Sequence, residues 1–145
     1  MAVGFSGVDP AGQPTDVVLD DGRWTALLFL SSACAGCADL WAGAGTVAGE
    51  DRALSVVVVT RSPITEDRGV VASLAPPGVS VVMSDEAFRA YRVAGAPFYA
   101  VVGGTPNRVA DEGVLMDLEQ VRGAVQRVGG TEAVGHAGNG AAGED

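Results

Sequence analysis

Basic residues are scarce in this chain, and their scarcity excludes two classes of partner. Nine basic residues stand against 18 acidic ones in 145 residues, which gives a formal net charge of −9. All nine are arginine and none is lysine, which we attribute, with the frequent Ala, Gly and Val, to codon bias. Nucleic acids and anionic membrane surfaces select clustered positive charge. Neither is therefore expected as a partner.

Long hydrophobic runs are also missing. No apolar stretch approaches the roughly 18 residues that are typical of a membrane-spanning helix. The segment from Met1 to Gly12 has no basic region followed by an apolar one, so it does not have the pattern of a signal peptide. If the chain is complete, a cytoplasmic protein is expected. If Met1 replaces a removed leader or membrane anchor, an extracytoplasmic protein is expected instead.

The chain has two cysteines, Cys34 and Cys37, and one histidine, His136. Two cysteines this close together cannot join distant elements into a disulfide framework, but they can form a local bond that opens and closes. Zinc sites use four nitrogen or sulfur ligands, and a copper site also needs more ligands than this pair supplies. No metal and no dissociable cofactor is expected. Two ordinary buried thiols remain an alternative.

Apolar runs separated by turn residues predict strands that alternate with helices. The mix of 48% hydrophobic and 19% charged residues fits one globular domain of this length. The continuous apolar run at 25–30 indicates a central strand buried on both faces, and the four valines within 54–60 indicate the clearest strand of the chain. The remaining strands are expected as short pieces around a turn at 9–12, and at 79–83, 98–102 and 108–115, the last two forming a hairpin.

Helices are expected between these strands. The first begins at Cys34, the second covers 65–74 with Pro63 near its start, the third follows an N-cap at Ser84 and runs from 85 to about 92, and the fourth covers 117–128. This order predicts an α/β fold with a mixed sheet. We expect one domain over residues 1–128 and a flexible Gly- and Ala-rich acidic tail over 129–145.

The segment Cys34-Ala35-Gly36-Cys37 is expected to carry the chemistry. At the start of a helix, unpaired amides and the helix dipole favour the thiolate form of Cys34. The thiolate is the nucleophile of disulfide exchange, and a second cysteine resolves the mixed disulfide. Cys34 is therefore expected to attack and Cys37 to resolve. The Ala-Gly spacer carries neither charge nor proline, so it does not indicate a redox potential.

A CxxC segment placed after a buried strand and at a helix start resembles the thioredoxin superfamily. Residues 91–98, Tyr-Arg-Val-Ala-Gly-Ala-Pro-Phe, resemble the family segment in which a glycine and one further residue precede a cis-proline. The resemblance implies that Pro97 is cis and lies beside the cysteines, and that the backbone of Ala96 pairs with an extended substrate segment. An ordinary trans proline that opens a strand is the alternative.

Residues 5–14 resemble the N-terminal hairpin of the TlpA-like and peroxiredoxin-like branch, and the extra helix and strand between Cys37 and Pro97 resemble its insertion. The resemblance covers about residues 5–128. It implies a thioredoxin-like fold, in which helices flank a central mixed β-sheet with an N-terminal hairpin and an inserted helix–strand unit. It also implies a thiol–disulfide oxidoreductase that exchanges with a protein dithiol or disulfide, outside the cytoplasm if an anchor precedes the chain.

Several positions depart from the family pattern. Ala33 replaces the tryptophan that is common before the first cysteine. Leu28 stands where thioredoxins have a buried aspartate that assists proton transfer, and Leu40 stands where TlpA-like proteins have an acidic residue. Asp39 is expected to point elsewhere, so the base for Cys37 is unassigned. These departures favour a specialised partner, and they leave open a non-enzymatic binding module whose thiols turn over slowly.

Single residues bear on two further possibilities, a peroxidase and an aromatic surface around the cysteines. Peroxiredoxins have a Pro-x-x-x-Thr-x-x-Cys pattern, but Leu27 stands at the proline position and Ser31 at the threonine position, which argues against a peroxidase. Four aromatic residues are candidates for the surface around the cysteines, with core packing as the expected role: Trp24, Trp41, Tyr91 and Phe98. Charged edge strands fit a monomer.

Overall fold

The computed structural model of the chain describes residues 2–19, 22–34, 36–50 and 53–137, with side chains up to residue 128. Asp20 and Asp21, which with Gly22 have the composition of a turn, lie outside the described residues, as do the spacer residue Ala35 and the side chain of His136. The described elements are β1 Phe5–Val8, β2 Pro14–Val17, β3 Trp24–Phe29, α1 Cys37–Glu50, β4 Leu54–Thr60, α2 Arg68–Leu74, β5 Ser80–Met83, α3 Asp85–Ala90, β6 Phe98–Gly103, β7 Arg108–Val114 and α4 Glu119–Ala137.

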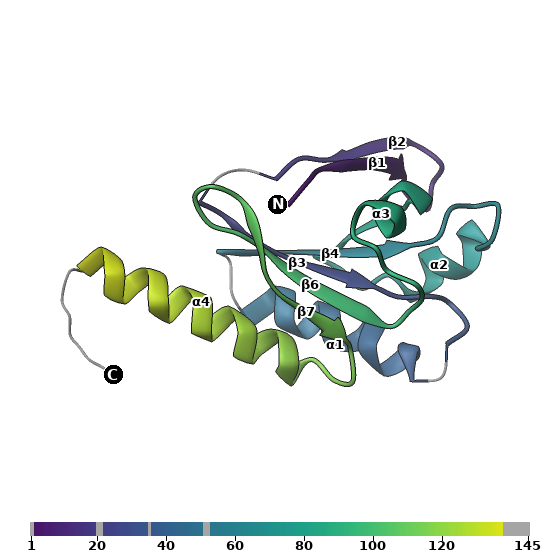
Figure 1. The fold of residues 1–145 in the computed structure, drawn as a ribbon. Coiled ribbons are helices and arrows are strands. Elements are labelled where there is room, and N and C mark those ends of the chain that lie inside the picture. The colour runs from purple at the N-terminus through teal and green to yellow at the C-terminus, as the bar shows by residue number, and fades with distance from the viewer. Residues whose placement is uncertain (1, 20–21, 35, 51–52, 138–145) are drawn as a thin grey trace.

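The strands form one mixed sheet in the order β2-β1-β5-β4-β3-β6-β7 (Figure 1). The three strands β3, β4 and β5 pair in parallel, and β6 pairs with β3 in the antiparallel direction. The expected hairpins β1–β2 and β6–β7 are both present. The mixed α/β sheet predicted from the order of apolar runs is therefore confirmed.

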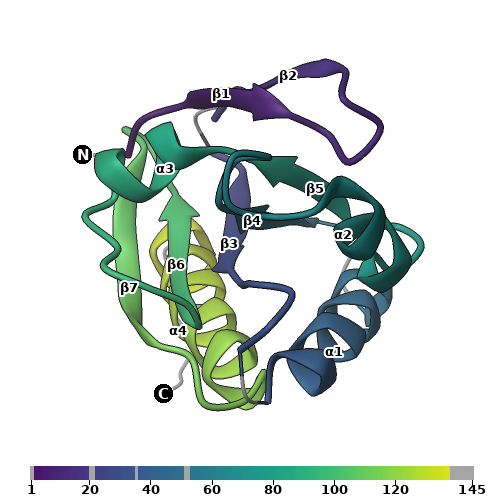
Figure 2. The same cartoon turned by 90° about the vertical axis from the view of Figure 1, so that its right-hand side faces the viewer.

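Both faces of the sheet are covered, which explains the unbroken apolar run in β3. Ala26 and Leu28 pack on one face with residues of α1, α2 and α4. Leu27 and Phe29 pack on the opposite face with residues of α3 and the N-terminal segment. Successive side chains of a strand point to opposite faces, so a strand in the middle of this sheet has no polar face. Figure 2 shows α1 and α4 on one side of the sheet and α3 on the other.

The first two helices begin later than their sequences suggest. The expected start of α1 at Cys34 is wrong, because the helix begins at Cys37, after Gly36 with a φ of +79°. This left-handed conformation cannot continue a right-handed helix. The expected start of α2 near Thr65 is also wrong, because the side chain of Asp67 accepts from the backbone N–H groups of Gly69 and Val70 and so caps a helix that begins at Arg68.

The last helix begins later and extends further than expected. It covers Glu119–Ala137 instead of 117–128, and the side chain of Asp117 accepts from the backbone N–H of Glu119 at 2.8 Å. Two glycines at 129 and 130 do not end the helix, because glycine costs about 1 kcal/mol in a helix interior and lacks the steric block of proline. The boundary after residue 128 and the flexibility of 129–145 stay predictions.

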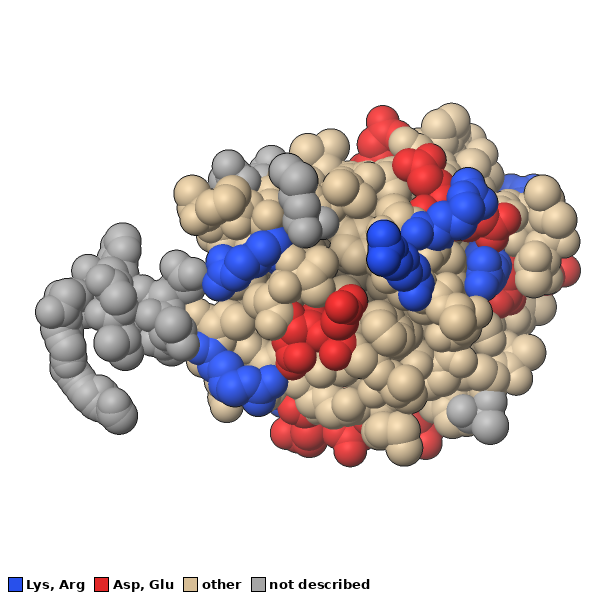
Figure 3. All heavy atoms as spheres, in the orientation of Figure 1, with Lys and Arg blue, Asp and Glu red and all other residues tan. Residues whose placement is uncertain are grey.

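No helix within the described residues is both long enough and apolar enough to cross a bilayer. Acidic and basic side chains are interspersed on the face shown in Figure 3, where the basic groups lie close to acidic ones. On this face the described residues therefore form no continuous basic surface of the kind that binds nucleic acid.

Replacing Gly7 with alanine is expected to destabilise the fold by about 2 kcal/mol, because β1 approaches β5 too closely for a side chain. A Cβ at Gly7 would collide with the carbonyl oxygen of Met83 and lie 2.8 Å from the Cβ of Ser84. Gly49 is the matched control, because a Cβ at this exposed helical position meets nothing within 4 Å. Gly49→Ala is expected to stabilise by up to about 1 kcal/mol. Urea unfolding measures both, and destabilisation of the same size by the two variants would contradict the packing argument.

Candidate active site

Three loops meet at the carboxyl ends of the parallel strands. The loop after β3, called the cysteine loop below, carries Cys34 and residues 31–33 and leads to Cys37 at the start of α1. The loop after β4 covers residues 61–67, and the segment 91–97 leads from α3 into β6. The pairing of Phe29 with Phe98 brings the beginning of β6 to the end of β3. The carboxyl ends of parallel strands are where open α/β sheets bind their ligands, because the loops there converge.

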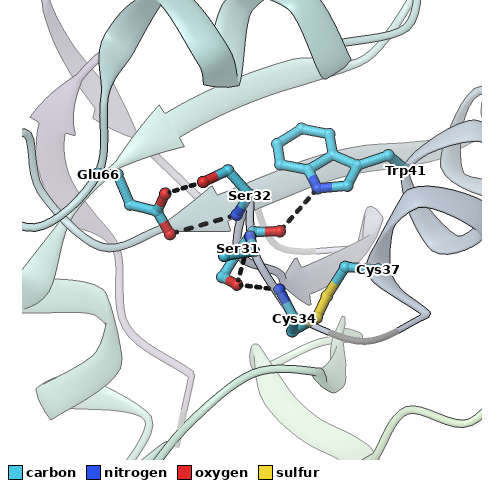
Figure 4. The surroundings of a disulfide bond; sticks show 7 residues. Ser31, Ser32, Cys34, Cys37, Trp41 and Glu66 are labelled. Atoms are coloured by element: carbon cyan, nitrogen blue, oxygen red, sulfur yellow. Dashed lines mark hydrogen bonds between the residues drawn. A yellow bond between two sulfur atoms is a disulfide. The ribbon is translucent and has the colours of Figure 1, made fainter.

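Cys34 and Cys37 form a disulfide, with their Cα atoms 5.3 Å apart (Figure 4). Cys37 opens α1 and is 1% exposed within the core beneath the sheet. Cys34 lies in the loop before the helix and is half-buried. The two cysteines therefore differ in access: a partner can reach Cys34 from solvent, whereas Cys37 is covered by the core.

Hydrogen bonds from Ser31 and Trp41 order the loop that carries Cys34. The Ser31 hydroxyl accepts from the backbone N–H of Ala33 at 3.2 Å and of Cys34 at 3.0 Å. The Trp41 indole N–H donates to the Ser31 carbonyl at 3.0 Å, which ties the loop to α1. Trp41 is 1% exposed, so its expected place in the core is confirmed.

Glu66 is a site residue that the sequence did not identify. It is the one buried carboxylate among the described side chains, at 8% exposure. It accepts from the Ser32 hydroxyl at 2.5 Å and from the Ser32 backbone N–H at 3.3 Å (Figure 4). The sequence suggested that Glu66 lies at a helix start, but it precedes the Asp67 cap and reaches across to the cysteine loop.

The positions at which related patterns place an acid are filled by apolar side chains. Leu28 is fully buried and Leu40 is 6% exposed, both in the cluster that contains Cys37. Asp39 is exposed on α1, as expected. Glu66 is therefore the acidic group that the fold brings to the cysteine loop. It contacts the loop at Ser32, two residues before Cys34.

The Ala96–Pro97 peptide bond is cis. Ala96 lines a pocket of about 460 Å³ together with residues 31–33 of the cysteine loop and residues of the β4–α2 loop. Neither the N–H nor the carbonyl of Ala96 has a hydrogen-bond partner among the described residues. The structure thus brings the expected docking residue to the cysteine loop, with its backbone groups free to pair.

The other aromatic candidates have core roles. Tyr91 is 7% exposed, and its hydroxyl donates to the carbonyl of Val3 at 2.6 Å, which fastens the N-terminal segment over the sheet. Phe98 packs against Phe29 with ring centroids 6.2 Å apart. Trp24 is half-buried at the far end of β3, away from the cysteines. Among the described residues no group of three His, Cys, Asp or Glu side chains could hold a metal ion.

Asp85 anchors the β4–α2 loop to the beginning of α3. Its carboxylate accepts from the backbone N–H of Ser62 at 3.0 Å and from the Ser62 hydroxyl at 2.8 Å. These bonds, with smaller contributions from Arg61 and Arg89, hold the pKa of Asp85 below its usual value of 3.8, although burial opposes the shift. The folded state therefore favours the ionised carboxylate.

Asp85→Asn is expected to remove part of the acid sensitivity of the fold. Because the folded pKa lies below the unfolded one, the ionised Asp85 stabilises the protein above the unfolded pKa, and this contribution is lost as the pH falls through the folded pKa. We expect the wild type to lose about 1 kcal/mol more than Asp85→Asn between pH 6 and pH 2, a small value because Asp85 is partly exposed. Urea unfolding at both pH values measures it, with exposed Glu86→Gln as the control. Equal losses in wild type and Asp85→Asn would refute the linkage.

Comparison with known proteins gives matches in structure alone. No family model matches the chain, and no curated protein sequence matches it. The exposed lipoprotein thioredoxin of Streptococcus pneumoniae strain TIGR4 superimposes with a TM-score of 0.73 at 15% identity, over 86% of this chain and 99% of that chain. The chain has a thioredoxin-like fold.

Two further solved structures agree with this assignment. A thioredoxin-like protein from Aeropyrum pernix matches with a TM-score of 0.66 at 15% identity, over 86% of this chain and 89% of that chain. A secreted disulfide oxidoreductase of Mycobacterium tuberculosis matches with a TM-score of 0.66 at 20% identity, over 85% and 95% of the two chains. The thioredoxin-like fold implied by the CxxC segment and residues 91–98 is confirmed, together with its N-terminal hairpin and its inserted α2–β5 unit.

Proposed function

We propose that the chain is a thiol–disulfide oxidoreductase that exchanges the Cys34–Cys37 disulfide with a protein partner. The observation that carries the proposal is the unequal access of the two bonded cysteines: Cys34 is half-buried and Cys37 is 1% exposed. An exchange enzyme needs one sulfur that a partner can reach and a second that is held in place to resolve the intermediate. The thioredoxin-like fold, which the secreted M. tuberculosis disulfide oxidoreductase shares, agrees with this chemistry.

Reduction of a partner disulfide takes two exchange steps. The Cys34 thiolate attacks a partner disulfide, so a bond forms between Cys34 and one partner sulfur while the other partner sulfur leaves as a thiolate. Cys37 then loses its proton to solvent or a base and attacks Cys34, which closes the Cys34–Cys37 bond and releases the second partner thiolate. The protein dithiol is oxidised by two electrons and the partner disulfide is reduced by two. A second dithiol protein regenerates the dithiol, and oxidation of a partner is the same sequence reversed.

The docking surface for the partner is proposed at Ala96 and Pro97. The unpaired N–H and carbonyl of Ala96 suit an extended segment that pairs with them as a β-strand does. The same pocket reaches the cysteine loop at residues 31–33, so a docked segment lies beside Cys34. We therefore assign Cys34 and Cys37 to exchange, and Ala96 and Pro97 to substrate binding.

Exposed apolar side chains near the site favour a protein as the substrate. Ile64, on the β4–α2 loop, is 93% exposed. Met116 is 77% exposed and follows Leu115, whose backbone N–H donates to the Pro97 carbonyl. Exposed apolar side chains on loops next to the site gain from contact with a large partner more than from contact with a small thiol. A separate part of the proposal concerns the oligomeric state: we propose that the chain acts as a monomer.

The test is the equilibrium between the Cys34–Cys37 disulfide and its dithiol across a glutathione series, followed by insulin reduction. The proposal requires a reversible two-electron couple and turnover of insulin that Cys34→Ser abolishes. The alternative is a binding module that keeps the docking surface at Ala96 but turns over slowly, which the apolar Leu28 and Leu40 favour. Intact binding of a peptide without turnover would select the module, and two thiols that never pair would exclude the oxidoreductase.

A further inference from the structure

The β4–α2 loop contacts both halves of the candidate active site. Its residues 61–67 follow β4 and lie against the cysteine loop on one side and the segment before β6 on the other. Arg61, Thr65, Glu66 and Asp67 line one pocket with residues 31–33 and Ala96. The loop is therefore placed to act on the reactive sulfur and on the docking segment separately.

The contact with the cysteine half is made by Glu66. A buried carboxylate is stable only when hydrogen-bond donors replace its lost water, and Ser32 supplies two of them. Ser31, the next residue back along the chain, accepts from the backbone N–H of Cys34. The carboxylate of Glu66 thus fixes the backbone immediately before the reactive cysteine without touching the sulfur.

The contact with the docking half is made by Arg61. Its guanidinium donates to the Ala94 carbonyl at 3.2 Å and lies over the Phe88 ring, 4.2 Å from the ring centroid. No carboxylate oxygen of a described residue lies within 4.0 Å of this guanidinium in an ion pair. Ala94 stands two residues before Ala96, so Arg61 holds the segment that presents the free backbone groups of Ala96.

Hydrogen bonds hold the loop in place on both sides of Ser62. The Ser62 carbonyl accepts from the backbone N–H groups of Thr65 at 2.9 Å and Glu66 at 3.0 Å, which closes a tight turn between Arg61 and Glu66. The backbone N–H and hydroxyl of Ser62 both donate to Asp85 on α3. The turn is thereby bonded to α3, and it links Arg61 on the docking half of the site to Glu66 on the cysteine half.

We propose that Arg61 and Glu66 are positioning residues, with Glu66 setting the reactivity of Cys34 and Arg61 setting the affinity for the partner's extended segment. The proposal rests on the proposed disulfide exchange. The two residues of the loop have separate effects. Loss of Glu66 changes the reactivity of the Cys34 sulfur, whereas loss of Arg61 changes the affinity for the partner. A loop that was merely structural would affect both properties together, through stability.

The Glu66 half is tested by the alkylation rate of Cys34 in the reduced protein with iodoacetamide, measured across pH. Glu66→Ala is expected to slow alkylation about tenfold, because the Ser32 donors lose their acceptor and the loop loses its alignment. Glu66→Gln keeps an acceptor for Ser32 and is expected to recover the rate to within about threefold. Asp67→Asn is the matched control, since it removes the neighbouring charge from the same pocket, keeps a good N-cap and does not touch Ser32. Ser32→Ala serves as a second probe if Glu66→Ala does not fold.

The Arg61 half is tested by insulin reduction. Arg61→Gln is expected to raise the KM for insulin about tenfold and to leave the alkylation rate of Cys34 within about twofold of wild type. Arg68→Gln, which removes an exposed arginine from the neighbouring helix, is the matched charge control. An unchanged KM in Arg61→Gln, or a fall in alkylation equal to that of Glu66→Ala, would overturn the division of roles.

The outcome for the positioning proposal is separable from that for the proposed function. If the wild type neither exchanges with glutathione nor reduces insulin, the oxidoreductase assignment fails. The alkylation series still decides the role of Glu66, because it needs only a free thiol at Cys34. Equal alkylation rates in wild type, Glu66→Ala and Ser32→Ala, with all three folded by circular dichroism, would overturn the positioning proposal on their own.

Discussion

Cys37→Ser is expected to trap the partner on Cys34 as a mixed disulfide and to lower turnover roughly a thousandfold. Under the proposed function, Cys37 supplies the resolving thiolate from the same CxxC segment, so resolution is an intramolecular step with a high effective molarity. Cys37 is 1% exposed, and the described structure bonds its sulfur to that of Cys34. Without it, release depends on an external thiol that must reach the mixed disulfide from solvent.

The measurement is a non-reducing gel of Cys37→Ser after incubation with insulin, with the adduct mass confirmed by mass spectrometry. Cys34→Ser is the matched control: it removes the accessible sulfur, keeps the buried one and is expected to give no adduct. The roles of the two cysteines would be reversed if Cys34→Ser formed the adduct and Cys37→Ser did not. Adduct formation by neither variant would count against nucleophilic exchange altogether.

Much of the fold could be predicted because its strands are determined locally. β4 covers Leu54–Thr60, the range that its run of four valines predicts, and Ser84 caps α3 as expected. In both places the residue type alone has a strong conformational preference, since β-branched side chains favour strands and a serine oxygen satisfies a helix amide. The packing of neighbouring elements then stabilises the conformation that the local sequence already prefers.

The start of α1 could not be predicted in the same way. Glycine at position 36 is compatible with a helix, a turn or a left-handed residue, and its φ of +79° is selected by the closed Cys34–Cys37 loop. Placing the helix start at Cys34 therefore failed at a residue whose conformation depends on its surroundings. The conclusion on Cys34 is altered only in detail, because the cysteine lies three residues before the first residue of α1 and its carbonyl accepts from the N–H of Cys37 at 3.1 Å.

Glu66 could not be found from the sequence because its partner is 34 residues away. Nothing near Ser32 in the chain indicates that a carboxylate will approach it, and an acidic residue before a helix has an ordinary capping explanation. The contact arises only when β3 and β4 pair in parallel and their following loops meet. The cis-proline segment was different, because the resemblance at residues 91–98 indicated it without any knowledge of the pairing.

Trp41→Ala is expected to destabilise the fold by about 3–5 kcal/mol, the largest effect on stability that we predict for one side chain. Trp41 is among the largest fully buried side chains and lies in the core beneath the sheet with Leu28 and Cys37. Its removal leaves a cavity in the core cluster that contains Cys37. Its indole N–H also donates to the Ser31 carbonyl, so the substitution removes a hydrogen bond of the cysteine loop in addition to the buried ring.

Trp41→Phe separates these two contributions. Phenylalanine retains most of the buried ring and loses the hydrogen bond to Ser31, so a loss of about 1–2 kcal/mol is expected, well below that of alanine. Urea unfolding followed by circular dichroism measures both, and Trp24→Phe is the control at the half-buried tryptophan at the other end of β3. If Trp41→Phe slows iodoacetamide alkylation of Cys34 while Trp24→Phe does not, the indole bond orders the reactive loop. If both leave the rate unchanged, Trp41 supports the site through packing alone, and Ser31 holds Cys34 by its hydroxyl without help from α1.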